Sequence, residues 1–369
     1  MNNSIKIGIT QGDTNGVGWE IILKIFADAK MSELCVPVIY GSKDAFNYYK
    51  KLYKEQLSDA SYTLVKSASE ARAKRINLVE CGTSPLELRP GEATPEAAQA
   101  ASASLTKCAQ ELKSGLIDAV VTAPINKESL NGVGFEFTGH TEFFAAQSGD
   151  SNEPLMFMCS EKLRVALVTK HIAVAQVASA ISEQSVVDSI KAVKRSLVED
   201  FEINEPRIAV MALNPHAGDG GVIGSEEGDV ITPAIRKAYS ESMMAFGPFA
   251  ADGFFAAGGY AKYDAVLAIY HDQGLIPFKT LSPEGVNFTA GLSLVRTSPD
   301  HGTAYDIAGK GEADPTSMRN AIYMAIDVVA SRKRYAQFSA NPLQRAEREK
   351  SSGRDLSVKD MPQFKEQSR

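Results

Sequence analysis

The segment Ile208-Ala-Val-Met-Ala-Leu-Asn-Pro-His216 is a short apolar run that ends abruptly in polar and turn-forming residues. The same pattern occurs in Val165-Ala-Leu-Val-Thr-Lys-His171 and in Ala265-Val-Leu-Ala-Ile-Tyr-His271. Continuous apolar runs of this length are typical of strands that are buried on both faces of a parallel sheet. Each run therefore predicts a buried strand that delivers a histidine at its carboxyl end.

Further strands and helices alternate along the 369-residue chain, as a parallel sheet with helical crossovers requires. We expect strands at Ile5–Thr10, Cys35–Tyr40, Asp118–Thr122, Val165–Thr169, Arg207–Ala212 and Ala265–Tyr270. We expect helices at Thr94–Ser114, Glu183–Asp200, Glu226–Ser240 and Pro315–Lys333. The predicted fold class is therefore α/β, in which ligands gather at the carboxyl ends of the strands.

The composition excludes several classes of protein. Hydrophobic residues make up 44% of the chain and charged residues 23%, which is typical of a globular protein and not of a disordered one. With 39 basic and 45 acidic residues the formal charge is −6, so we expect no nucleic-acid partner, and any bound anion needs a local site. The four cysteines form no CxxC pair, and neither a signal peptide nor a membrane-spanning run is present, so we expect a cytoplasmic protein without membrane contact.

Three histidines at the carboxyl ends of strands in one sheet are expected to come close together. His171, His216 and His271 are therefore a candidate metal site, because neutral imidazoles bind zinc, cobalt, nickel or iron(II). Open coordination positions would make this site catalytic, with Asp272 orienting a ligand or the substrate. The alternative for each histidine is a strand-end residue that only hydrogen-bonds a backbone carbonyl.

A second group of polar residues follows the His271 run. Lys279, Asn287 and Arg296 offer an ammonium, an amide and a guanidinium, which together suit a phosphate or a carboxylate. His140 and Thr141 lie between aromatic residues after a glycine turn, as in a loop that faces a substrate. A solvated surface and a simple helix N-terminus are the alternatives for these two segments.

The Gly-rich segment Gln11–Glu20 follows the first strand and leads into a helix, so its backbone N–H groups are candidates for holding an anion. It does not have the GxGxxG spacing, and a tight strand-to-helix turn needs the same glycines. Both interpretations stay open from the sequence.

Six parts of the chain resemble, in order, the family of 4-hydroxythreonine-4-phosphate dehydrogenases, which acts in pyridoxal phosphate biosynthesis. They are Gly8–Asp13 with Gly16–Glu20, Val121–Lys127, Phe137–Phe143, Leu213–Gly218, Tyr270–Leu275 and Asp300–Ala304. The chain departs from the family's pattern at Gln11 and Thr14, where many relatives have proline, and in the spacing before Thr94 and Asn287. The exact substrate therefore stays open.

The resemblance implies site residues and a partner. His171, His216 and His271 are expected to bind a divalent cation (zinc, cobalt or magnesium), with His171 reaching into the partner subunit's site in a homodimer. His140, Thr141, Lys279, Asn287 and Arg296 are expected to contact the phosphorylated substrate.

A more distant resemblance, through His301–Gly309 and the Gly12-Asp13 loop, is to the isopropylmalate and isocitrate dehydrogenases. It implies a two-domain α/β/α sandwich with mostly parallel sheets and the active site in the cleft between domains. The first, cofactor-side domain would be residues 1–125 plus 297–345, the second, metal and substrate domain 126–296, and 346–369 a polar tail. NAD would be bound by Gly12, Asp13, His301, Gly302, Thr303 and Asp306. Asp306 would accept hydrogen bonds from the adenosine ribose, which favours NAD over NADP.

Together these expectations describe an NAD-dependent, metal-requiring dehydrogenase. It would oxidise 4-phosphooxy-L-threonine to 2-amino-3-oxo-4-phosphooxybutanoate, which decarboxylates to 3-amino-2-oxopropyl phosphate. The metal would lower the pKa of the substrate hydroxyl and then polarise the ketone. The catalytic base stays open between Lys127, a metal-bound hydroxide and Asp272.

Three alternatives remain. A relative in the same fold would oxidise 4-phosphothreonate or 4-phosphoerythronate, in which a hydroxyl replaces the amine. A metal-dependent hydrolase would activate water with the three histidines, but it leaves the His301 loop without a purpose. A non-catalytic phosphate-binding module has no use for three converging histidines.

Overall fold

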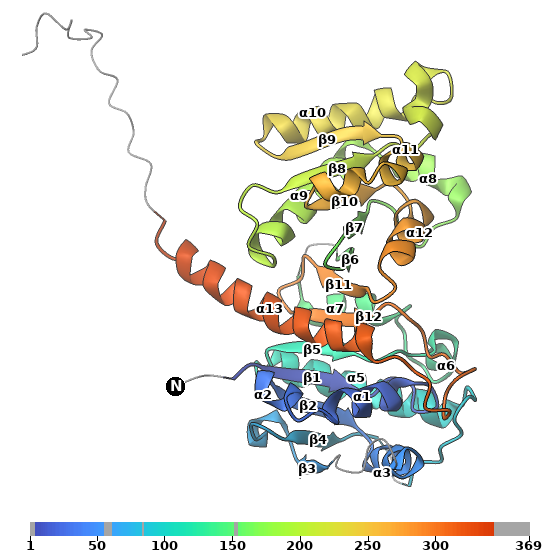
Figure 1. The fold of residues 1–369 in the computed structure, drawn as a ribbon, viewed down its shortest axis with the longest axis vertical. Helices are drawn as coiled ribbons and strands as arrows, with labels where there is room; N and C mark the ends of the chain where they lie inside the picture. The colour runs from blue at the N-terminus through green and yellow to red at the C-terminus, as the bar shows by residue number, and fades with distance from the viewer. Residues whose placement is uncertain (1–3, 55–60, 83–84, 151–153, 343–369) are drawn as a thin grey trace, which may run out of the picture.

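The computed structural model describes residues 4–54, 61–82, 85–150 and 154–342. Its strands are β1 (Lys6–Thr10), β2 (Val36–Gly41), β3 (Tyr62–Val65), β4 (Ile76–Glu80), β5 (Ala119–Thr122), β6 (Leu155–Cys159), β7 (Arg164–Leu167), β8 (Arg207–Met211), β9 (Met244–Phe249), β10 (Ala265–Ala268), β11 (Val286–Ala290) and β12 (Arg296–Pro299). They form one twelve-stranded sheet in the order β3-β4-β2-β1-β5-β12-β11-β6-β7-β10-β8-β9. Within the described residues, only the pairings β12–β11, β11–β6 and β6–β7 are antiparallel. The predicted α/β class with a mostly parallel sheet is confirmed (Figure 1).

The six strands expected from the sequence are all present, with ends that differ by one or two residues. The three that lead to histidines, β7, β10 and β8, are neighbours and run parallel. Their carboxyl ends therefore meet at one edge, as predicted. The antiparallel strands β6, β11 and β12 were not expected. β12 reads Arg-Thr-Ser-Pro, and a polar segment of this kind does not resemble a buried strand.

The helices are α1 (Gly18–Phe26), α2 (Met31–Leu34), α3 (Lys43–Leu52), α5 (Pro95–Lys113), α6 (Lys127–Gly132), α7 (His140–Ser148), α8 (Val177–Ala180), α9 (Glu183–Glu199), α10 (Thr232–Ser240), α11 (Ala251–Ala256), α12 (His271–Leu281) and α13 (Thr316–Ser339). Short helical turns are η1 (Ala68–Glu70), η2 (Val174–Gln176), η3 (Pro215–Gly221), η4 (Glu227–Ile231) and η5 (Gly259–Lys262). The four helices expected from the sequence are present. Thr94 caps α5 as predicted, because its Oγ1 accepts the N–H of Ala97 at 3.2 Å.

Helices cover both faces of the sheet, but they do so differently. On one face, α1, α3, α9, α10 and α13 pack on a single core that runs the length of the sheet. On the other face there are two separate cores, one under α5, α6 and α7 and one under α11 and α12. Between Val120 of the first and Met158 of the second, the same face carries Arg296, which pairs with Val120, and Asn287, which pairs with Met158. The gap between the two cores is therefore lined by polar side chains.

Strand β12 connects the N-terminal strands of the sheet to the strands of the middle of the chain. β12 pairs with β11 on one side and with β5 on the other, so the chain after residue 296 returns to the strands of residues 6–122 (Figure 1). One sheet runs through both expected domains, and the division into 1–125 plus 297–345 and 126–296 stays a prediction. The expected tail at 346–369 lies outside the described residues.

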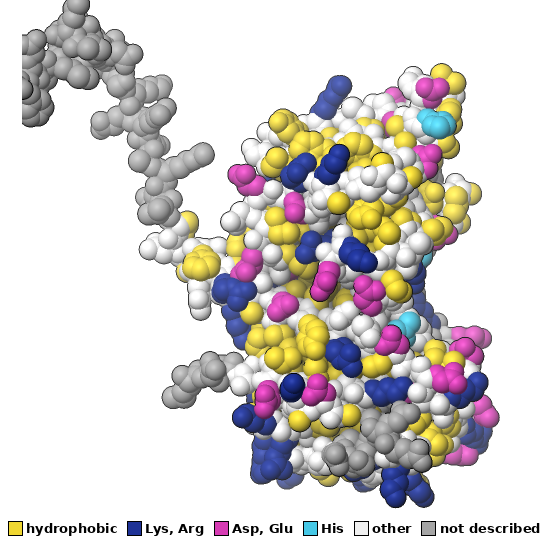
Figure 2. Space-filling view, in the orientation of Figure 1, with side chains coloured by type: hydrophobic (Ala, Val, Ile, Leu, Met, Phe, Trp, Pro, Cys, Tyr) yellow, Lys and Arg dark blue, Asp and Glu magenta, His cyan; other side chains and the backbone are white. Residues whose placement is uncertain are grey.

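On the face shown in Figure 2, acidic and basic side chains lie interspersed among hydrophobic ones. This mixture accords with the formal charge of −6. None of the helices in the described ranges is long and apolar enough to cross a lipid bilayer. Because the chain is acidic overall, an anionic ligand would need a local group of basic side chains.

Candidate functional site

A cavity of about 350 Å³ lies in the gap between the two smaller cores. Thr122 of β5, Met156 of β6, Asn287 of β11 and Arg296 of β12 line it from the sheet, and the N-termini of α7 and α12 line it from the sides. All five predicted substrate residues line this cavity: His140, Thr141, Lys279, Asn287 and Arg296. Lys127, His171, His271, His301 and Gly302 line it as well. Segments that are far apart in the sequence thus meet at one place.

Arg296 is a buried cation, 2% exposed, whose hydrogen-bond partners are hydroxyls. Its Nε and Nη2 donate to Thr122 Oγ1 at 3.3 and 2.8 Å, and its Nη1 donates to Thr289 Oγ1 at 3.1 Å. Burial lowers the pKa of Arg296 to about 9, so the guanidinium is still charged at neutral pH. The charge of Glu142, in the same cavity, offsets the effect of burial only in part, and two of the five N–H bonds of the guanidinium remain. The site therefore favours an anion beside Arg296.

Two buried atoms at the cavity, His140 Nε2 and Asn287 Oδ1, have no hydrogen-bond partner among the described residues. Buried polar atoms are normally paired, so these two atoms indicate that a ligand supplies the partners. Burial, together with the positive charges of Arg296 and Lys127, lowers the pKa of His140 well below its usual value. His140 is therefore neutral and carries one ring proton.

The segment around His140 forms a helix N-terminus and also lines the cavity. The sequence left open whether it is a loop that faces the substrate or a simple helix N-terminus, and the structure combines the two. α7 begins at His140 after Gly139, and no side chain caps it. The first N–H groups of a helix attract anions when no side chain satisfies them. The predicted substrate contact at His140 and Thr141 thus coincides with a favourable place for negative charge.

Two lysines differ in their surroundings. Lys279 Nζ lies 3.1 Å from Asp300 Oδ1, so part of its charge is already balanced. Burial raises the pKa of Asp300. Lys127 has no ion pair within the described part of the chain, and its charge contributes to the low pKa of both His140 and His171.

Three cavity residues, Thr122, Glu142 and Asp300, were not singled out from the sequence. Thr122 ends a buried apolar strand, which is the same signal that marked the histidines. Glu142 and Asp300 are each adjacent in sequence to predicted site residues. Whether their side chains line the cavity depends on the fold, which the sequence pattern does not report.

His171 and His271 are brought together, with ring centroids 5.8 Å apart. His271 Nδ1 lies 2.7 Å from Asp272 Oδ1, which leaves Nε2 of His271 for another ligand. Burial lowers the pKa of His171, which favours the neutral ring that a metal needs. The two imidazoles are therefore suited to bind one divalent cation.

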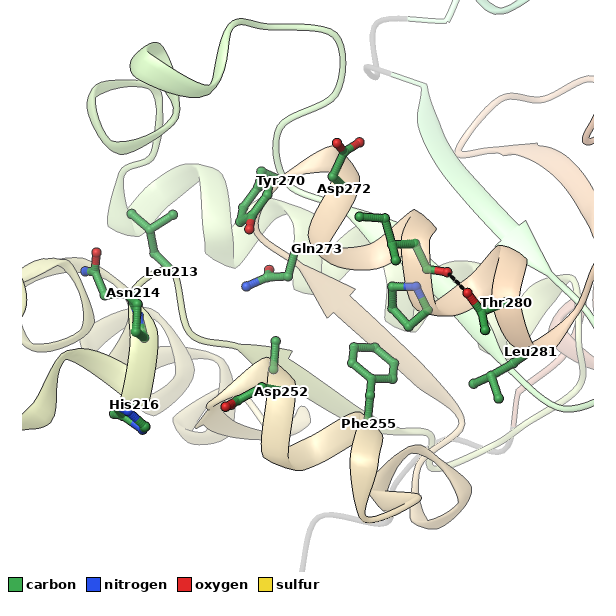
Figure 3. A pocket seen from close by; sticks show the side chains of 14 residues that line it. Leu213, Asn214, His216, Asp252, Phe255, Tyr270, Asp272, Gln273, Thr280 and Leu281 are labelled. Atoms are coloured by element: carbon green, nitrogen blue, oxygen red, sulfur yellow. Dashed lines mark hydrogen bonds between the residues drawn. The ribbon is translucent and has the colours of Figure 1, made fainter.

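His216 is not beside them. It lines a second cavity of about 660 Å³, between α11 and α12. Figure 3 shows His216 and Asp272 at separate ends of this cavity, pointing away from each other. Among the residues that the structure describes, no group of three His, Cys, Asp or Glu side chains is placed to hold a metal. The carboxyl ends of β7, β10 and β8 lie side by side, as predicted. Within the described residues of one chain, however, the imidazoles of His171, His216 and His271 do not come together.

The backbone after β8 explains the position of His216. In η3, His216, Ala217 and Asp219 have φ of 53°, 53° and 44°, so the chain turns with the left-handed conformation that side chains rarely adopt. This turn directs His216 away from the sheet edge. Sequence periodicity predicts the strand, but it does not report the hand of the turn that follows.

The predicted cofactor residues fall into two groups, the buried Gly12 and Asp13 and the more exposed loop of residues 301–306. Gly12 has φ +68°, and a Cβ there would lie 2.3 Å from the carbonyl oxygen of Pro124. Asp13 is 1% exposed, and its carboxylate accepts the Asn15 N–H at 2.9 Å and the Tyr305 hydroxyl at 2.8 Å. Asp13 therefore holds the 301–306 loop through Tyr305, whereas the close contact of Gly12 is with Pro124.

The second group is the loop of residues 301–306. His301 and Gly302 line the cavity between the two smaller cores, and Asp306 is exposed. Thr303 accepts the Val17 N–H through its backbone oxygen at 3.0 Å, which joins this loop to the start of α1. The Gly-rich segment 11–20 is buried throughout and forms a tight strand-to-helix turn.

Comparisons with known proteins point to one family. Residues 33–325 match the family model described as pyridoxal phosphate biosynthetic protein PdxA. The 4-hydroxythreonine-4-phosphate dehydrogenase of Bacteroides thetaiotaomicron is 48% identical over 96% of this chain and 96% of its own. The crystal structure of the 4-hydroxythreonine-4-phosphate dehydrogenase from Klebsiella pneumoniae is 34% identical, covers 89% of this chain and 99% of its own, and gives a TM-score of 0.79. A terephthalate 1,2-cis-dihydrodiol dehydrogenase from Burkholderia xenovorans is 26% identical, covers 88% of this chain and 98% of its own, and gives a TM-score of 0.59.

Proposed function

Because this chain belongs to the family of the pyridoxal phosphate biosynthetic protein PdxA, we propose that it oxidises 4-phosphooxy-L-threonine with NAD and a divalent cation. The hydroxyl-bearing carbon gives a hydride to NAD, and the hydroxyl gives up its proton. The product, 2-amino-3-oxo-4-phosphooxybutanoate, then loses carbon dioxide to give 3-amino-2-oxopropyl phosphate.

The buried guanidinium of Arg296 is the observation that carries this proposal. It is charged, almost fully buried and bonded to hydroxyls, and it lies in the same cavity as the unpartnered Nε2 of His140. A phosphate monoester supplies the negative charge and the acceptor oxygens that these groups need. A neutral substrate would leave the cost of burying Arg296 unbalanced.

The pair His171 and His271 fits a divalent cation. Their ring centroids lie 5.8 Å apart, and these two rings would hold the cation. A cation bound there would polarise the oxygen of the reacting hydroxyl as a Lewis acid. The Asp272 carboxylate orients His271 for this role through the hydrogen bond at Nδ1.

A third imidazole requires a second copy of the chain. Since His171 lies beside His271 while His216 lines another cavity, the geometry favours His216 as the ligand that the partner subunit donates. The expectation from the sequence, that His171 is the donated residue, remains the alternative. The site then needs a homodimer to be complete.

Lys127, once its side chain has lost its proton, is the favoured proton acceptor. It lines the substrate cavity, whereas Asp272 lines the neighbouring one and is engaged with His271. The nicotinamide is expected to approach from the loop of His301 and Gly302, which borders the same cavity. The adenosine would then lie along the exposed side of this loop, near Asp306.

A direct assay tests the proposal. The purified protein, with a divalent cation, is given NAD and 4-phosphooxy-L-threonine, 4-phosphothreonate or 4-phosphoerythronate, and NADH formation is measured for each. We expect the highest kcat/KM with 4-phosphooxy-L-threonine and loss of activity on chelation, restored by adding the cation back. Higher kcat/KM with either hydroxy acid would assign the chain to the alternative substrate. Release of inorganic phosphate without NAD would instead indicate the hydrolase.

A further inference from the structure

Thr122 is fully buried at the end of β5 and touches both of the groups that the proposed phosphate site depends on. Its Oγ1 accepts two hydrogen bonds from Arg296, from Nε at 3.3 Å and from Nη2 at 2.8 Å. The same Oγ1 lies 3.5 Å from Nδ1 of His140. One hydroxyl therefore connects the guanidinium to the imidazole.

The protons of this group can be counted. A hydroxyl has two acceptor lone pairs and one hydrogen, and Arg296 already donates twice to Thr122. The hydrogen of Thr122 is then available to His140 Nδ1, 3.5 Å away, and in this arrangement Nδ1 is the acceptor. A neutral imidazole that accepts at Nδ1 carries its proton on Nε2. This is the buried ring atom that has no partner in the described part of the chain.

We propose that Thr122 is a positioning residue, which holds His140 as an Nε2–H donor and fixes the guanidinium of Arg296 so that both face one phosphate. Without this hydroxyl, His140 could present a bare nitrogen lone pair to the phosphate, and the two would repel. The inference rests on the proposed function for the identity of the anion. It assigns no contact with the substrate to Thr122 itself.

The neighbouring strand offers a matched control. Thr297 on β12 is also fully buried, but its hydroxyl donates to the carbonyl of Ala321 on α13, on the opposite face of the sheet. Thr297→Val and Thr122→Val remove the same atom from adjacent strands. Any effect of simply losing a buried hydroxyl is therefore common to both variants.

The first test is spectroscopic and needs no turnover. In the full-length protein labelled with ¹⁵N-histidine, long-range ¹H–¹⁵N spectra report the tautomer of each of the five histidines, and His140→Gln assigns the signal. We expect His140 to be neutral with its proton on Nε2 in the native protein, in Thr122→Ser and in Thr297→Val. In Thr122→Val we expect a mixture of tautomers, because nothing then selects between them. A proton on Nδ1 in the native protein would overturn the proposal.

The second test measures anion binding and kinetics. By calorimetry with inorganic phosphate, Thr122→Val is expected to bind about tenfold more weakly, whereas Thr122→Ser and Thr297→Val stay close to the native protein. The KM for 4-phosphooxy-L-threonine should rise by a similar factor while the KM for NAD changes little. Unchanged phosphate affinity in Thr122→Val would contradict the role.

These outcomes separate two kinds of failure. An absence of dehydrogenase activity in the native protein would refute the proposed function, but the tautomer and the phosphate affinity would still decide the role of Thr122. If Thr122→Val does not fold, the native spectrum and the rescue by Thr122→Ser decide it.

Discussion

At the scale of single residues, the site is defined by one buried charge, Arg296, that has no salt bridge within the described residues and that Glu142 balances only in part. Most buried charges are paired, because removing an ion from water is expensive. Arg296 instead has hydroxyl partners, and its neighbours in the cavity include the N-terminus of α7 and an unpartnered imidazole nitrogen. The protein thus keeps a preorganised place for negative charge, at a cost to its own stability.

Replacing Arg296 by methionine should separate binding from folding. We expect the KM for the phosphorylated substrate to rise about a hundredfold with little change in the KM for NAD, because a buried charge partner of the phosphate is lost. The free energy of unfolding without ligand should change little, since the variant loses the hydrogen bonds of Arg296 but no longer buries a charge that Glu142 balances only in part. Steady-state kinetics and urea unfolding measure the two effects.

The control is Arg207→Met, because Arg207 is exposed and its guanidinium lies over the ring of Tyr263 at the start of β8. This variant should leave both KM values unchanged. A rise in the KM for NAD, with the substrate KM constant, would reassign Arg296 to the cofactor.

Asp306 is predicted to set the choice of cofactor. Its exposed carboxylate, in the loop that Asp13 and Tyr305 tie down, would accept hydrogen bonds from a ribose and repel the 2′-phosphate of NADP. Asp306→Asn should therefore lower the ratio of kcat/KM for NAD to that for NADP. An unchanged ratio would mean that Asp306 only caps the turn, and a native preference for NADP would refute the prediction.

At the scale of elements, the turn η3 stores strain that neighbouring side chains compensate. Three residues other than glycine have positive φ there, each at a cost of about 1–2 kcal/mol. Glu227, 5% exposed, holds the start of this turn, because its Oε1 accepts the N–H groups of Leu213 and Asn214 at 2.8 and 2.7 Å. Its Oε2 accepts the side-chain amide of Asn214 at 2.9 Å. The direction of His216 therefore depends on Glu227.

Glu227→Gln should loosen this turn, since an amide cannot accept at both of its heteroatoms. We expect the free energy of unfolding to fall by about 1–3 kcal/mol, with faster hydrogen exchange at the amides of Leu213 and Asn214. Thermal or urea unfolding and exchange measured by mass spectrometry provide the test.

Glu226→Gln is the matched control, because the Glu226 carboxylate bonds the Asn214 side-chain amide, at 2.7 Å, and backbone N–H groups of its own segment, whereas Glu227 bonds the backbone of Leu213 and Asn214. It should have a clearly smaller effect on both measurements. Equal effects of the two variants would show that Glu227 has no special role in the turn.

At the scale of the whole molecule, one sheet carries both the substrate cavity and the strand ends that bear the histidines. The long core under α13 and α9 is continuous, so the two ends of the sheet are held as one body on that face. The opposite face is divided, and the cavity lies in the division. His216 lies on a separate cavity, and we expect its site to be completed by a second copy of the chain.

Mixing inactive variants tests which histidine is shared. His171→Ala, His216→Ala and His271→Ala should each abolish turnover at limiting cation while leaving the fold intact. If His216 comes from the partner, mixed dimers of His216→Ala with His271→Ala contain one complete site and regain activity. Mixed dimers of His171→Ala with His271→Ala lack a ligand in both sites and stay inactive.

The reverse pattern would assign the shared position to His171. No recovery in any mixture, with subunits shown to exchange, would contradict a shared site. Full activity of any one of the three single variants would remove that histidine from the metal site.

The sequence by itself determined the class of the fold, the six principal strands, the longer helices and the five predicted substrate residues that line the cavity between the two smaller cores. These features depend on local apolar runs and on polar residues at their ends, which are readable from neighbouring residues. The antiparallel strands β11 and β12, the isolation of Arg296 and the separation of His216 from His271 were decided only by the tertiary structure. They depend on which strands become neighbours and on the hand of one turn, and these follow from packing between segments that are distant in the chain.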